Sequence, residues 1–149
     1  MRRFTLREAV LADVPAVVRL HHLTLETSLP FLPVIHTVEE GEVFFRDVVF
    51  ARGEVWVAEA SGEIVGYSAF REDWLDHLYV HPQYHGSGIG SELLAKARMQ
   101  YGRLQAWVFQ KNHAAIAFYE SKGFTCVRTT DGRDNEEREP AALYVWKTP

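Results

Sequence analysis

The chain has 149 residues, of which 47% are hydrophobic and 24% charged, and its formal net charge is −4. This length fits one domain over residues 1–149, and the acidic balance argues against a nucleic-acid binder, which usually carries a basic face. No apolar run reaches the roughly 18 residues of a membrane helix and residues 1–7 lack the core of a signal peptide, so we expect a cytoplasmic protein without a membrane partner.

The first third predicts a strand and two helices. Residues 3–7 alternate polar with apolar, as in a half-buried strand. Asp13 is a candidate N-cap for a helix whose inward side chains are Val14, Val17, Val18, Leu20 and His21. Two prolines then interrupt the chain, and the capping-box spacing of residues 37–40 begins a second helix that ends at Gly53.

Three strands follow, over residues 54–60, 63–70 and 74–80. The first two are separated only by Ser61-Gly62, which favours a hairpin. Beyond them the pattern predicts a helix over 91–101, a strand over 103–109, a helix over 112–122, and strands over 124–128 and 143–146. We therefore predict an α/β fold with a mixed, mostly antiparallel central sheet, one parallel central strand pair and helices on both faces.

Three alternating glycines occupy the junction between the 74–80 strand and the helix after it, in the segment His85-Gly86-Ser87-Gly88-Ile89-Gly90-Ser91. Such a turn exposes backbone amides beside a helix N-terminus and suits a diphosphate. A P-loop would need Lys after the last glycine, and a dinucleotide fingerprint would need a glycine at position 91, so both are excluded. A tight turn without a ligand is the alternative interpretation.

The cysteine and histidine patterns do not predict a metal site. Cys126 is the only cysteine, which excludes an internal disulfide, and its apolar stretch predicts a buried side chain. His77, His81 and His85 have a four-residue spacing, but Pro82 and the glycines prevent the helix that would align them. We therefore expect no metal.

The glycine turn, preceded by Leu-Tyr-Val-His-Pro at 78–82, resembles the cofactor motif of the GCN5-related N-acetyltransferase (GNAT) family. A second block of that family, Asn before a helix that ends in Phe-Tyr and then Gly-Phe, is similar to residues 112–124. The order of predicted elements matches the family over nearly the whole chain. His85 stands where the family usually has Gln or Arg, which puts a side-chain contact there in doubt and leaves the amides intact.

The resemblance implies a GNAT-like acyl-CoA N-acyltransferase fold and acetyl-CoA as co-substrate, with the pantetheine arm along the strand before the glycines. It implies that Tyr119 protonates the departing thiolate and that Asn112 contacts the cofactor arm. The implied cofactor-binding residues are Leu78, Tyr79, Val80, His85, Gly86, Ser87, Gly88, Ile89, Gly90, Ser91, Asn112 and Tyr119. Asn112 is equally explained as an N-cap, and Tyr119 as a packed core residue.

Transfer to an amine also requires a proton acceptor. Strict alternation places position 76 on one face with positions 74, 78 and 80, and family members often carry a base at the positions that match Trp74 and Asp76. Asp76 is therefore the candidate base, acting through water, and a structural hydrogen-bond acceptor is the alternative role.

These features predict an enzyme that transfers the acetyl group of acetyl-CoA directly to an amine, carried by a small molecule or a peptide. The alternative is a CoA-binding regulatory module without turnover. Trp74, Trp107 and Phe109 are candidates for the acceptor pocket or for the core, and the acidic run 131–139 is a solvated loop or a border of that pocket. The sequence leaves open which amine is used and whether the chain forms a homodimer.

Overall fold

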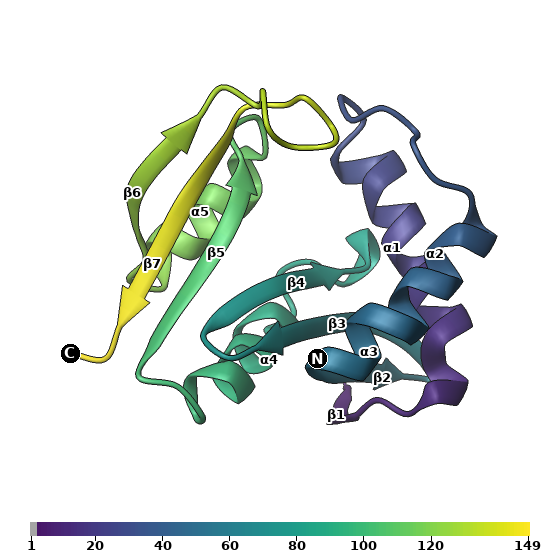
Figure 1. Cartoon of the computed structure of the whole chain (residues 1–149). Coiled ribbons are helices and arrows are strands. Elements are labelled where there is room, and N and C mark those ends of the chain that lie inside the picture. The colour runs from purple at the N-terminus through teal and green to yellow at the C-terminus, as the bar shows by residue number, and fades with distance from the viewer. Residues whose placement is uncertain (1–2) are drawn as a thin grey trace.

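The computed structural model describes residues 3–149. Met1 and Arg2, the first two residues of the 1–7 segment discussed above, lie outside the described residues. A seven-stranded sheet forms the centre, with helices on both sides (Figure 1). The strands are β1 (Thr5–Glu8), β2 (Glu54–Ala60), β3 (Glu63–Arg71), β4 (Trp74–Val80), β5 (Arg103–Phe109), β6 (Thr125–Thr130) and β7 (Ala141–Lys147). The α-helices are α1 (Val14–Ser28), α2 (Val38–Phe44), α3 (Phe50–Arg52), α4 (Ile89–Arg98) and α5 (His113–Ser121).

The strand order is β1-β2-β3-β4-β5-β7-β6, and every neighbouring pair is antiparallel except β4 and β5. This confirms the predicted mixed sheet with one parallel pair. Within residues 3–149, β4 and β5 are registered only at Trp74 and Gln105, near the start of each strand. Beyond that point the two strands diverge (Figure 1).

Helices cover the two faces of the sheet separately. On one face, Val17 and Val18 of α1 pack with Phe45 against Val57 and Tyr67. On the other face, α4 buries Ile89 and Leu93 against β2 and β3, while α5 contributes Tyr119 to a core shared with β5 and β7. None of the helices within residues 3–149 is both long and apolar enough to cross a membrane.

Local capping chemistry explains the helix boundaries. The Thr37 hydroxyl accepts the Glu40 amide and the Glu40 carboxylate accepts the Thr37 amide, so the predicted capping box forms. The predicted second helix runs as α2, a π-helical turn η2 (Phe45–Val49) and α3. Asp13 also precedes α1, but its carboxylate bonds to Arg7 and the Val10 amide and does not cap that helix, which corrects the prediction.

Two predictions about individual side chains are wrong. Cys126 is exposed, because β6 is an edge strand with nearly every residue at the surface. Asp76 does not share a face with Leu78 and Val80, because the β3–β4 register shifts between Ala69 and Phe70. His77 pairs with Ala69 and Leu75 pairs with Phe70, so Asp76 is the extra residue of a β-bulge, which no alternation pattern reveals.

Candidate active site

The divergence of β4 from β5 leaves one edge of β4 open. The His81 amide donates to Val65 O at 2.8 Å, toward β3. Successive amides of a strand point to opposite sides, so the backbone groups of Val80 and Leu78 point away from β3, toward the side where β5 has separated. This edge therefore offers backbone donors and acceptors to an extended, amide-bearing molecule.

The glycine turn lies at the end of this edge. Gly86 and Gly88 have φ values of +79° and +91°, which glycine adopts without strain. A Cβ at either position would have no protein atom within 4 Å, so the space beside the turn is open. Gly88 is the N-cap of α4 and no side chain caps this helix, so the amides of residues 89–91 remain available to an anion. The Ile89 side chain is buried, and only its backbone faces the turn.

His85 contacts the strand next to the turn. Its Nε2 donates to Val80 O at 3.0 Å, and its side chain is exposed. His81 accepts the Gln83 amide, and His77 contacts Tyr67. The three evenly spaced histidines thus have three different partners.

Tyr119 lies on α5, which packs beside β5, and Asn112 is the N-cap of this helix. Tyr119 is 7% exposed, and burial, followed by the proximity of Tyr79, raises the pKa of its hydroxyl. Within residues 3–149 the Tyr119 hydroxyl forms no hydrogen bond. It is also not one of the fully enclosed polar atoms that lack a partner there, so it reaches accessible space. Asn112 Oδ1 accepts the Ala115 amide at 3.2 Å, so it caps α5 with its carbonyl oxygen and keeps its NH2 group for another contact.

Asp76 is separate from these groups. Its carboxylate is bonded to Arg71, with Nε–Oδ2 and Nη2–Oδ1 distances of 2.9 and 3.4 Å. Burial raises the pKa of this carboxyl, while the charge and hydrogen bond of Arg71 act in the opposite direction. This geometry matches the structural alternative stated for Asp76, and it leaves the carboxylate partly exposed at the start of β4.

A cluster of aromatic and histidine side chains, His21, Phe45, Tyr67, His77 and Tyr79, lies between α1, η2 and the sheet. The Tyr67 hydroxyl is completely buried and contacts His21 Nδ1 at 2.8 Å and His77 Nδ1 at 3.3 Å. Burial lowers the pKa of His21 to about 4 and that of His77 to about 3, and raises the pKa of Tyr79 to about 12. Sequence reasoning missed this cluster because its members come from four elements, and His21 was assigned only an inward position.

Two loops meet beside the open face of β5. Phe31, after α1, packs edge-on to Phe109 at a centroid distance of 6.3 Å. His36 Nε2 lies 2.5 Å from Glu136 Oε1, which joins the loop after α1 to the acidic loop between β6 and β7. Trp107 is 44% exposed, so the core alternative for this residue is wrong. The loop after α1 and the acidic loop 131–139 therefore lie side by side (Figure 1).

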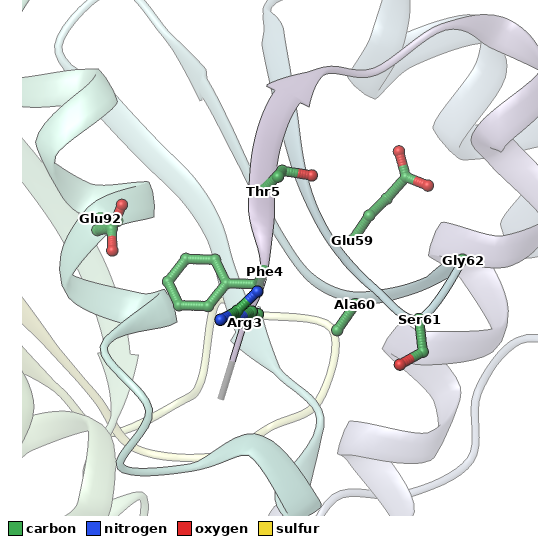
Figure 2. A pocket seen from close by; sticks show the side chains of 8 residues that line it. All are labelled: Arg3, Phe4, Thr5, Glu59, Ala60, Ser61, Gly62 and Glu92. Carbon is green, nitrogen blue, oxygen red and sulfur yellow. The ribbon is translucent and has the colours of Figure 1, made fainter. Parts of the chain in front are cut away.

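A surface hollow of about 640 Å³ lies elsewhere. It is formed by β1, the β2–β3 hairpin and the first turn of α4, and Figure 2 shows Arg3, Glu59 and Glu92 around it. It contains none of the predicted site residues, and a hollow with polar walls of both charges does not by itself indicate a ligand.

Comparisons with known proteins agree with this geometry. A family model described as an acetyltransferase (GNAT) domain matches residues 51–126. The chain is 29% identical over 142 residues to the peptidyl-lysine N-acetyltransferase YiaC of Escherichia coli (strain K12), covering 95% of each chain. It is 27% identical over 137 residues to an L-methionine sulfoximine/L-methionine sulfone acetyltransferase of Salmonella typhimurium, covering 81% of this chain and 80% of that one.

A solved structure shares the fold. It is yncA from Salmonella typhimurium, determined with its cofactor acetyl-CoA, which superimposes with a TM-score of 0.73 at 22% identity and covers 99% of this chain and 95% of that chain.

Proposed function

Because this chain belongs to the GNAT family of acetyltransferases and is an acetyl-CoA-dependent N-acetyltransferase, we propose that it acetylates the side-chain amine of a lysine within a peptide. The observation that carries the proposed site is the open edge of β4, which ends in an uncapped glycine turn. We take the whole chain, 1–149, as one catalytic domain. A regulatory module without turnover is not supported by the comparisons, in which the named relatives are enzymes.

The proposed cofactor position follows that edge. The pantetheine arm bonds to the outward backbone groups of Leu78 and to the Val80 amide, since Val80 O already accepts from His85. The pyrophosphate accepts hydrogen bonds from the uncapped amides of residues 89–91. Positive φ at Gly86 and Gly88 aims these amides at the ligand, and the open space at both glycines leaves room for it. Asn112 supplies its free NH2 group to the cofactor arm.

Tyr119 is the proposed acid. The thiolate that leaves when the C–S bond breaks needs a proton, and a tyrosine with a raised pKa keeps its proton until a strong base forms beside it. The accessible hydroxyl of a nearly buried side chain, next to Tyr79 of the cofactor strand, supports this role.

Three observations favour a peptide lysine over a free amino acid. The relative that covers 95% of both chains is named for peptidyl-lysine. A free amino acid brings a carboxylate that needs a cation, whereas Lys111, whose Nζ lies over the Phe31 ring, is already bonded to Glu139. The acidic 131–139 loop and the net charge of −4 also attract a cationic partner.

The proposal is tested by measuring free CoA released from acetyl-CoA with three acceptors. These are a short peptide with one lysine and a blocked N-terminus, the same peptide with that lysine replaced by norleucine, and free L-methionine sulfone. We expect release with the lysine peptide alone, with mass spectrometry locating the acetyl group on Nζ. Faster release with the free amino acid than with the lysine peptide would refute the acceptor class.

A further inference from the structure

The Tyr67 hydroxyl joins two histidines from different elements. It lies 2.8 Å from His21 Nδ1 on α1 and 3.3 Å from His77 Nδ1 on β4. A hydroxyl has one proton, so it donates to one ring and accepts from the other. The shorter contact fits O–H···N to His21, and the longer one fits N–H···O from His77. His77 then has its proton on Nδ1 and its lone pair on Nε2.

The second ring nitrogen of His77 is left for another contact. Nδ1 faces the Tyr67 hydroxyl, so Nε2 lies on the opposite side of the ring from that hydroxyl. His77 is only partly buried. Its Nε2 is not one of the fully enclosed polar atoms that lack a partner within residues 3–149, so this nitrogen is accessible. It stands one residue before Leu78, where the open edge of β4 begins, and its ring packs beside Tyr79 at a centroid distance of 6.1 Å.

We infer that His77 is the catalytic base of the acetyl transfer, with Tyr67 and His21 as the residues that position it. This rests on the proposed function only in that the acceptor is an amine at the β4 edge. In this arrangement the Tyr67 hydroxyl orients the ring of His77, and His21 in turn holds the Tyr67 hydroxyl. Tyr67 is fixed by complete burial, and Phe45 packs on both imidazoles at 5.3 Å between ring centroids.

The step balances as follows. The neutral amine nitrogen forms a bond to the thioester carbonyl carbon, the C–S bond breaks, and the electron pair goes to sulfur, which takes the Tyr119 proton. The surplus proton on the new amide nitrogen passes to His77 Nε2. The imidazolium then releases this proton to water, and Tyr119 regains one from water. The products are the N-acetyl amide and free CoA thiol.

The position of His77 suits this role better than that of Asp76. Burial, and then the nearby His21, lowers the pKa of His77 to about 3, so the ring is neutral at physiological pH and is a weaker base than an ordinary imidazole. The nitrogen it deprotonates is bonded to the carbonyl-derived carbon and is far more acidic than a free alkylammonium. The Asp76 carboxylate, by contrast, already holds both contacts with Arg71 and lies on the bulge, off the face of Leu78.

The test compares variants in the CoA-release assay at saturating acetyl-CoA. We expect His77→Gln to lower kcat by about 100-fold or more, while the Kd for acetyl-CoA stays within about twofold. Tyr67→Phe keeps the packed ring and removes only the hydroxyl, so kcat should fall with KM unchanged. His77→Ala should recover activity when imidazole is added, which a purely structural residue would not do. The matched control is His22→Gln, on the same helix as His21.

Opposite results would overturn the inference. His77→Gln with a kcat within threefold of the original chain, or Asp76→Asn with the 100-fold loss instead, would remove His77 as the base. The ratio of the kcat of each variant to that of the unaltered chain is measured with whichever amine the unaltered chain acetylates fastest. If the proposed acceptor class is wrong, the acceptor preference of the unaltered chain reveals it. If the proposed base is wrong, only the kcat ratio reveals it.

Discussion

The partly buried pair His21 and His77 should make the stability of this protein depend on pH well above the range in which carboxylates titrate. His77 and His21 have folded-state pKa values of about 3 and 4, against about 6.5 for an unperturbed histidine. As the pH falls through 6.5, the unfolded chain takes up protons at both residues and the folded chain does not. The unfolded state then binds more protons, so stability falls with falling pH until the folded pKa values are reached.

The size of the effect follows from the unfolded state. Between pH 7 and pH 5 an ordinary histidine becomes almost fully protonated, which costs the folded state about 2 kcal/mol for each ring that stays neutral. The pair therefore costs about 4 kcal/mol, a large part of the roughly 5–15 kcal/mol by which domains are stable. The result is insensitive to the exact folded pKa, provided that it stays below about 4.5.

The assay is urea unfolding of the unaltered chain and of His77→Gln at pH 7 and pH 5. The variant should lose about 2 kcal/mol less between the two values, equivalent to a difference of about 4–8 °C in the shift of Tm. The pKa of Asp76 is raised by burial and acts in the opposite direction, but it acts in both proteins and cancels. His113→Gln, an exposed site at the start of α5, is the control. Equal losses in the variant and the unaltered chain would refute the reasoning.

Three further predictions concern the site. Tyr119→Phe should lower kcat by about 100-fold or more and leave the Kd for acetyl-CoA unchanged, since only the donated proton is removed; an unchanged kcat in the CoA-release assay would remove the assigned acid. Gly88→Val should weaken acetyl-CoA binding by calorimetry more than tenfold, whereas Gly62→Val, which has a similar positive φ and equally open space, should strain the chain without that loss. Equal affinities would contradict the phosphate site. His85→Ala should leave the Kd within about threefold, because its bond to Val80 O is exposed and the turn amides remain; tenfold weaker binding would make His85 a cofactor ligand.

Elements fixed by local chemistry were predictable from the sequence. The boundaries of β2 and β4 agree with the predicted strands, and the hairpin between β2 and β3 forms with positive φ at both Ser61 and Gly62. The glycine turn and the Asn112 cap were also found in advance, because each depends on neighbours within four residues of the chain. Helix α4 begins two residues earlier than predicted, since glycine at its N-cap hides the boundary.

The surroundings of the proposed catalytic residues were decided only by the tertiary structure. The bulge at Asp76 depends on how β3 and β4 share hydrogen bonds, and it moves the predicted base off the face of Leu78. The open edge of β4 depends on the divergence of β5, and the His21–Tyr67–His77 contact joins residues 46 and 10 positions apart. The sequence by itself therefore determined the glycine turn and the family, because short runs of neighbouring residues carry both. The surroundings of the proposed acid and base were determined by packing, because burial and hydrogen-bond partners come from distant parts of the chain.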